Sequence, residues 1–161
     1  MAKIVAAITM SVDGYITGPD DGPGKGLGEG GERLHYWVFG APWTYETAPH
    51  GEPDGEDADY LSAMMARVGA VVIGHTMYEA ADHWGDKNPF EVPIFGGGAN
   101  VIRQGLDAGI VDQLHIIVAP VILGAGERLF EDFTKSLDLE NQGVRQSRYA
   151  TFIQYGVKPQ G

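Results

Sequence analysis

Residues 96–126 read GGGANVIRQGLDAGIVDQLHIIVAPVILGAG and carry the strongest structural signal in the chain. Three consecutive glycines come first, and apolar residues at helical spacing follow them, which predicts a loop that opens a helix over Ala99–Ala108. A long apolar run then predicts a strand over Gln113–Leu123. The first turn of such a helix presents free backbone N–H groups and the positive end of its dipole, which together bind phosphate. The stretch therefore predicts an α/β fold with a dinucleotide site.

A second stretch has the same character. Ala70–Gly74 is predicted to be a buried strand, and Gly74-His75-Thr76-Met77 follows it where a helix is expected to begin. Two phosphate-binding helix starts after two strands of one sheet suit the two ends of a dinucleotide. Each start also has a simpler interpretation: Thr76 is an ordinary N-cap, and the glycines form a loop that lets helix and sheet pack closely.

The remaining elements are predicted from periodicity and from turn residues. The apolar run 3–9 indicates a central strand covered on both faces, and two antiparallel strands are expected within residues 137–157. The Gly- and Pro-rich segments 18–31 and 48–59 are expected to be loops. Further predicted elements are a short helix over Arg33–Phe39, a helix over Asp57–Val68 capped by Asp57 or Asp59, a helix from Thr76 and a short strand over Val92–Phe95. Together they predict a mixed sheet flanked by helices.

Length, composition and charge limit the class of protein. A chain of 161 residues, 43% of them hydrophobic, can bury one substantial core, so we expect one domain over residues 1–161. The net charge of -11 opposes binding to nucleic acid, to anionic lipid and also to an anionic cofactor. There is no cysteine, no 18-residue apolar run and no paired histidine pattern, so we expect a soluble, cytoplasmic protein with no disulfide, no membrane partner and no metal.

Asp13 is the candidate for chemistry. It follows the first predicted strand, at the carboxyl end where open α/β sheets place their ligands, and could orient a substrate or relay a proton there. The alternative is an aspartate that starts a turn at Asp13-Gly14. The pattern G-x-G-x-x-G at 26–31 does not follow a predicted strand, and it contains a carboxylate, so we assign it to a loop. Four aromatic residues just after that loop could stack on a flat heterocycle or could pack on the core: Tyr36, Trp37, Trp43 and Tyr45.

Four motifs together resemble a known family. They are Ser-Val-Asp-Gly-Tyr-Ile at 11–16, Val-Ile-Gly-His-Thr-Met-Tyr-Glu at 72–79, Gly-Gly-Ala-Asn at 97–100, and the run from 108 to 126 that ends in Ala-Pro-Val-Ile-Leu-Gly-Ala-Gly. In order and context they resemble the dihydrofolate-reductase-like superfamily, and in particular the C-terminal reductase domain of the bacterial riboflavin-biosynthesis deaminase/reductase. The resemblance implies a three-layer α/β fold with a mixed central sheet and an antiparallel C-terminal strand pair.

The resemblance also implies an activity and a site. It implies an NADPH-dependent reductase that transfers hydride to a small substrate and that dimerises through its sheet-rich end. The adenosine-side phosphates would be held by Gly74, His75, Thr76 and Met77, and the pyrophosphate by Gly97, Gly98, Ala99, Asn100, Val101 and Ile102. Ser11, Asp13 and Gly14 would lie near nicotinamide and substrate, with Asp13 or a bound water assisting protonation, and Trp43 is the aromatic residue we assign to the substrate.

The chain departs from that family pattern at three points. His75 stands where relatives often carry arginine, and a histidine that is mostly neutral near pH 7 leaves use of NADH open. Gly96 stands where riboflavin-pathway relatives have a glutamate that contacts substrate, which argues against the riboflavin intermediate as substrate. Phe95 passes directly into Gly96 where relatives insert a further strand and helix, so we expect that a segment is missing near 95–96.

Two hypotheses about function follow from these features. The first is a nicotinamide-dependent reductase of a small heterocyclic substrate, either pterin-like or pyrimidine-like. The second is a homodimeric protein that binds the nicotinamide nucleotide without turnover, since Gly96 and His75 both depart from the catalytic pattern. A structural domain without any ligand is the remaining alternative.

Overall fold

The computed structural model describes residues 3–47, 49–75 and 98–159. Its strands are β1 (Val5–Met10), β2 (Gln113–Val118), β3 (Leu139–Gln146) and β4 (Thr151–Val157). Its helices are the 3₁₀ helix η1 (Gly31–His35), α1 (Tyr36–Phe39), α2 (Gly55–Met65) and α4 (Ala99–Asp107). The strands form one mixed sheet in the order β1-β2-β4-β3, in which β1 and β2 are parallel and the other neighbours antiparallel. This is the predicted α/β fold with an antiparallel C-terminal pair.

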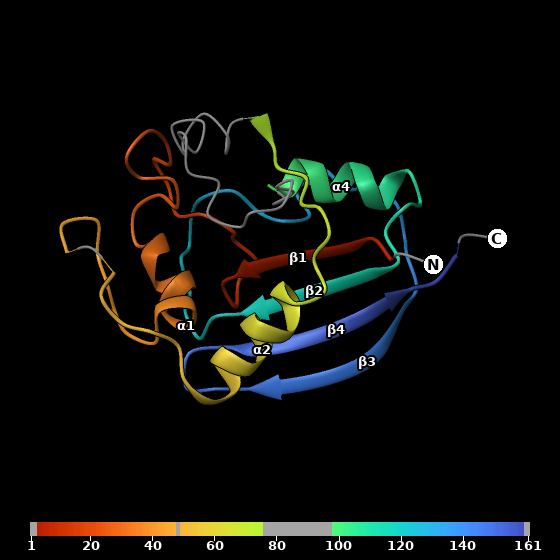
Figure 1. Ribbon diagram of the computed structural model, residues 1–161. Coiled ribbons are helices and arrows are strands. Elements are labelled where there is room, and N and C mark those ends of the chain that lie inside the picture. Colours follow the sequence, from red (N-terminus) through yellow and green to blue (C-terminus); the bar gives the residue numbers. More distant parts are fainter. Residues whose placement is uncertain (1–2, 48, 76–97, 160–161) are drawn as a thin grey trace.

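Helices cover both faces of this sheet, which makes three layers (Figure 1). Side chains alternate along β2, so that Leu114 and Ile116 face α4 whereas Ile117 faces α1 and α2. The α4 layer buries Ile102 and Leu106 of the helix against those strand residues. The opposite layer is aromatic and contains Trp37, Tyr60 and Phe152. The sheet therefore separates two apolar clusters, one beneath each set of helices.

The helix predicted over Ala99–Ala108 is confirmed, with Ala108 as its C-cap. The prediction worked because Ala99, Ile102 and Leu106 lie on one helical face, and all three are buried. The antiparallel pair within 137–157 is also confirmed, and β1 matches the predicted first strand within one or two residues. Among the described residues, no helix is long and apolar enough to cross a membrane.

Three predicted elements need correction. Residues 70–74 do not form a strand, and Val72 is 43% exposed, because the described chain offers this apolar run no neighbour to complete a ladder of hydrogen bonds. β2 ends at Val118 and not at Leu123, since Pro120 has no N–H to donate. The predicted helix over Arg33–Phe39 is instead two shorter ones, η1 and α1.

The start of α2 also differs from the prediction. Its N-cap is Asp54, and Asp59 lies inside the helix on an exposed face. Asp57 lies in the first turn, is buried and bonds to the Ser147 side chain in the β3–β4 turn. Burial raises the pKa of Asp57. The predicted helix from Thr76 and the predicted strand over Val92–Phe95 lie outside the described residues, as does the expected break near 95–96.

Candidate functional site

Two loops meet where β1 and β2 end. The parallel register pairs Met10 with Val118, so both strands deliver their chains to the same edge of the sheet. Beyond that point the Val12 N–H donates to the carbonyl of Val121 at 2.8 Å, and the Leu129 N–H donates to the Gly14 carbonyl at 3.1 Å. The segments 11–17 and 119–129 therefore run beside one another as a paired rim, and Asp13 lies in the first of them.

The Asp13 carboxylate binds the facing segment directly. Its Oδ1 accepts from the Leu123 N–H at 3.1 Å, and its Oδ2 accepts from the Gly124 N–H at 2.8 Å. The bond with the Ser11 side chain is the largest cause that lowers the pKa of Asp13 to about 2, and these two N–H groups lower it further. At neutral pH Asp13 is therefore an anion that braces two loops and has no proton to donate.

Ser11 and Gly14 form the turn that presents this carboxylate. Ser11 is fully buried, and its Oγ accepts from the Tyr15 N–H at 2.9 Å. Gly14 donates its N–H to the Ser11 carbonyl at 3.0 Å and has a φ of 87°, a conformation that favours glycine. The turn at Asp13-Gly14, which the sequence offered as the alternative to a catalytic role, is therefore present. The predicted substrate contacts of Ser11 and Gly14 stay predictions, and the Ser11 hydroxyl is engaged within the turn.

We expect Asp13→Asn to lower the thermal midpoint at pH 7, because the amide NH₂ replaces an acceptor that faces a backbone N–H. A carboxylate whose pKa falls from 3.8 to about 2 on folding stabilises the protein above about pH 4, and that contribution is lost as the pH falls toward about 2. The difference between wild type and variant should therefore shrink over this range in acid. Thermal unfolding as a function of pH measures it, with Asp59→Asn on the exposed face of α2 as control. Equal midpoints at pH 7 would show that the carboxylate does not brace the loops.

The end of segment 70–74 lies beside the start of α4. A Cβ atom placed on Gly74 would be 3.6 Å from Cγ2 of Val101, so the end of segment 70–74 reaches the first turn of α4. In that turn Gly98 is an extended N-cap without a side-chain hydrogen bond, and no heavy atom of the described residues lies within 4 Å of where its Cβ would stand. Asn100 is exposed, whereas Ala99 and Ile102 are buried. Gly74 and His75 are the last described residues before residue 98. Thr76, Met77 and Gly97 lie outside the described residues.

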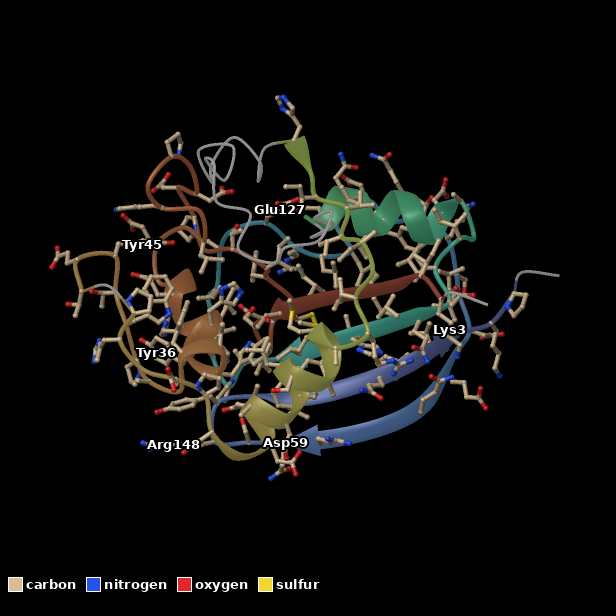
Figure 2. The ribbon with its side chains drawn as sticks, in the orientation of Figure 1. Lys3, Tyr36, Tyr45, Asp59, Glu127 and Arg148 are labelled. Carbon is tan, nitrogen blue, oxygen red and sulfur yellow. The ribbon has the colours of Figure 1, made fainter. Side chains whose placement is uncertain are left out.

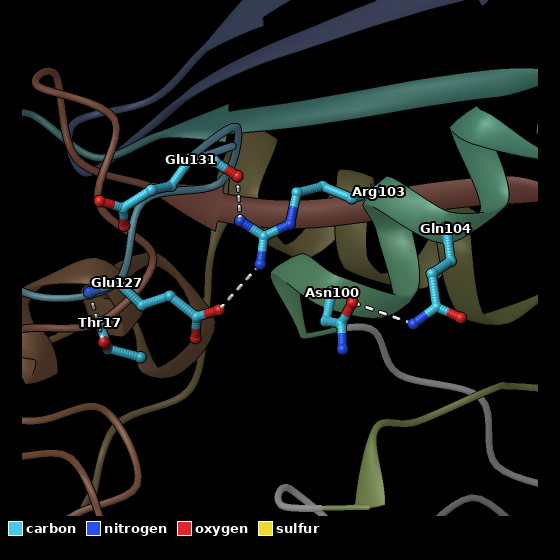
Figure 3. A network of polar contacts seen from close by, with 6 residues as sticks. All are labelled: Thr17, Asn100, Arg103, Gln104, Glu127 and Glu131. Atoms are coloured by element: carbon cyan, nitrogen blue, oxygen red, sulfur yellow. Dashed lines mark hydrogen bonds and ion pairs between the residues drawn. The ribbon is translucent and has the colours of Figure 1, made fainter. Parts of the chain in front are cut away.

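A polar network that the sequence analysis missed links α4 to the rim (Figure 3). The Arg103 Nη1 donates to the Glu131 carbonyl, and its Nη2 lies 3.6 Å from Glu127 Oε1. Glu127 in turn donates its N–H to Thr17 Oγ1 at 3.2 Å. Figure 2 shows Glu127 beside the start of α4. An arginine one turn into a helix that follows glycines, in a chain with 11 basic and 22 acidic residues, is the sequence signal that could have identified this network.

The four predicted aromatic residues do not form one cluster. Trp37 is buried against Phe152 and Tyr60, so it belongs to the core, and Tyr36 lies edge-on to Tyr149 beside α1 (Figure 2). Trp43 packs between Phe39 and Tyr45, with both ring-centroid distances 5.6 Å. The Tyr45 hydroxyl accepts from the Leu27 N–H at 2.8 Å and so ties this pair to the loop at 26–31. Trp37 thus follows the alternative of packing on the core, and Trp43 and Tyr45 lie beyond the end of α1 in a separate aromatic group.

Polar side chains elsewhere do not form a metal centre in the described ranges, where no group of three His, Asp or Glu residues is placed to hold an ion. The buried indole N–H of Trp43 has no hydrogen-bond partner there. Trp43 is the aromatic residue that we predicted to contact the substrate, and this contact stays a prediction.

The fold is dihydrofolate-reductase-like. The structure superposes on the dihydrofolate reductase of Enterococcus faecalis, solved with NADP(H), with a TM-score of 0.52, 15% identity and 98% of both chains covered. It superposes on a protein from Shewanella sp. PV-4, assigned provisionally to riboflavin biosynthesis, with a TM-score of 0.63, 19% identity, and 98% of this chain and 99% of that one covered. At such identities the likeness establishes the fold alone.

A family model identifies the resemblance more closely. Residues 91–151 match the RibD C-terminal domain, which confirms the resemblance inferred from the motifs. The uncharacterized protein YyaP of Bacillus subtilis (strain 168) is 34% identical over 59 residues, which cover 37% of this chain and 31% of YyaP. The match thus spans about a third of that relative. The segment 91–151 contains α4, β2 and the second half of the rim.

Proposed function

We propose that this protein is an NAD(P)H-dependent reductase of a small heterocyclic substrate, pterin-like or pyrimidine-like. The observation that carries the proposal is the convergence of Gly74 and Val101, which brings together the two segments assigned to a dinucleotide. The match to the RibD C-terminal domain and the dihydrofolate-reductase-like fold support it. The Arg103–Glu127 ion pair joins α4 to the paired rim, and a substrate at the rim would therefore meet the cofactor.

The first turn of α4 fits a pyrophosphate. Its leading N–H groups have no side-chain cap, and no described residue comes within 4 Å of where a Cβ of Gly98 would stand, so the backbone of Gly98, Ala99 and Asn100 would hold the phosphates. The nicotinamide, when bound, supplies the hydride. His75 would contact the adenosine side, and it stands where relatives often carry an arginine, which extends the proposal to NADH.

The chain's own contribution to the reaction is positioning. Asp13 fixes segment 119–129 against segment 11–17 and keeps a negative charge at the rim at neutral pH. A fixed carboxylate can orient an N–H group of a heterocycle or a water that delivers the proton. We also propose that the protein works as a homodimer, as the resemblance implies.

The test is thermal stabilisation of the purified protein by NADPH, NADP, NADH and FMN. A ligand that binds only the folded state adds about 2.7 kcal/mol to stability at 100 times its dissociation constant, which is a readily measured shift. We expect NADPH or NADH to raise the midpoint and FMN to leave it unchanged. No shift with any nicotinamide nucleotide would overturn the proposal. Cofactor affinity without oxidation by pterin or pyrimidine substrates would favour the non-catalytic binding protein.

A further inference from the structure

Arg103 occupies an unusual position for a helix arginine. It is the fifth residue of α4, and Figure 3 shows its guanidinium between the first turn of the helix and Glu127. Side chains on a helix lean toward its N-terminus, which carries a long arginine back to the helix start. The side chain is 22% exposed. A guanidinium has five N–H donors, and among the described residues the contacts of Arg103 to Glu127 and to the Glu131 carbonyl use only some of them.

Glu127 faces this arginine from a fixed backbone. Its carbonyl accepts from the Ile16 N–H at 2.8 Å, and its N–H donates to Thr17 Oγ1 at 3.2 Å. The ion pair itself is loose, since 3.6 Å exceeds the ~2.8 Å of a direct charged hydrogen bond. The segment 11–17 therefore holds the Glu127 carboxylate near Arg103, but the two groups do not form a tight ion pair.

We propose that the Arg103 guanidinium binds the pyrophosphate of the dinucleotide, and that Glu127 is a built-in competing anion that sets the affinity of this site for anionic ligands. The inference rests on the proposed function. In the free protein Glu127 partly neutralises Arg103, and a phosphate at the first turn of α4 must compete with it. The pair also connects the cofactor side of the site to segment 11–17, which carries Asp13 at its turn.

Electrostatics around Glu127 support a displaceable partner. Burial raises the pKa of Glu127, Arg103 lowers it, and the charges of Asp21 and Glu131 raise it. Two nearby carboxylates thus repel Glu127 where one guanidinium attracts it. Protonation of Glu127 in mild acid would remove the competitor and release Arg103, so ligand affinity should rise as the pH falls.

The experiment compares matched charge removals. ADP-ribose contains the pyrophosphate and adenosine of the cofactor, and its binding to wild type, Glu127→Gln and Glu131→Gln is measured by calorimetry. Both variants remove one negative charge from the same neighbourhood, but the Glu131 side chain points away from Arg103 and is exposed (Figure 3). We expect Glu127→Gln to bind about three- to fivefold more tightly, and Glu131→Gln to change affinity by less than about twofold.

The variant Arg103→Gln tests whether the effect of Glu127 depends on the arginine. It should weaken ADP-ribose binding about fivefold, and Glu127→Gln should have no further effect in the Arg103→Gln background, because the competition needs the arginine. Additive effects, or equal gains from both glutamate variants, would overturn the inference. Midpoints of thermal unfolding show that each variant is folded at the temperature of the titration.

The pH dependence provides an independent readout. The pyrophosphate diester of ADP-ribose stays ionised from neutral pH into mild acid, so a change in affinity over that interval belongs to the protein. The wild type should bind more tightly toward the acid end, and Glu127→Gln should lose that part of the dependence. An identical slope in both proteins would overturn the inference. If the wild type binds NADPH but these contrasts fail, only the inference is wrong; if it binds no nicotinamide nucleotide and no ADP-ribose, the proposed function fails with it.

Discussion

Replacing Gly126 with alanine should destabilise the protein by about 3 kcal/mol or more, because the new methyl group has no space. A Cβ at this position would overlap the carbonyl oxygen of Thr17, and it would also lie 2.8 Å from the carbonyl carbon of Gly18. These are backbone atoms, which cannot rotate away as a side chain can. The φ of 125° adds strain for any residue with a Cβ. The variant should force the two segments of the rim apart.

Gly124→Ala is the matched control in the same loop. Gly124 also has a positive φ, 77°, but a Cβ there would meet no heavy atom within 4 Å. Its substitution should therefore cost only the left-handed backbone strain, about 1 to 2 kcal/mol. Urea unfolding of both variants measures the difference. Equal losses would mean that the close crossing of Gly126 over residues 17–18 does not hold the rim together.

The spacing of apolar residues and the turn residues predicted the elements that depend on nearby sequence alone. The helix α4 follows from apolar residues three and four apart, and the pair β3–β4 follows from two strand-forming runs joined by a short turn. The run Ala70–Gly74 has the same apolar character, yet it forms no strand, because a strand needs a neighbour as well as a suitable composition. Within the described part of the chain, the sheet has no strand beside this run.

The sequence indicated candidate segments for the site but not their contacts. Gly74, at the end of one of these segments, lies near Val101 in the first turn of α4. The partners of Asp13, however, are backbone N–H groups 110 and 111 residues away, and no local pattern identifies them. The same is true of Arg103 and Glu127, whose pairing depends on how segment 119–129 returns past α4. The roles of these residues toward substrate and cofactor stay predictions.

Phe152→Ala should cost about 3 to 5 kcal/mol of stability, since it removes a large buried ring from a packed cluster. Phe152 is 1% exposed, its ring stacks on Tyr60 with centroids 4.3 Å apart, and it meets Trp37 edge-on at 5.3 Å. Urea unfolding followed by tryptophan fluorescence and circular dichroism gives the loss. Val144→Ala on the neighbouring strand, where the side chain is 56% exposed, should change stability by less than about 0.5 kcal/mol. A loss at Phe152 no larger than that of Val144 would contradict the assigned core.

The position of Phe152 predicts which property survives the substitution. Its cluster lies beneath α1 and α2, whereas α4 packs on the opposite face of the sheet through Ile102 and Leu106. Leu106→Ala should cost about 2 to 5 kcal/mol as well, but it removes a contact that holds α4 in place. At a temperature where both variants remain folded, ADP-ribose affinity should fall for Leu106→Ala and stay at the wild-type value for Phe152→Ala. Equal weakening in both variants would mean that the sheet transmits the disturbance, and that the two layers do not act independently on the cofactor site.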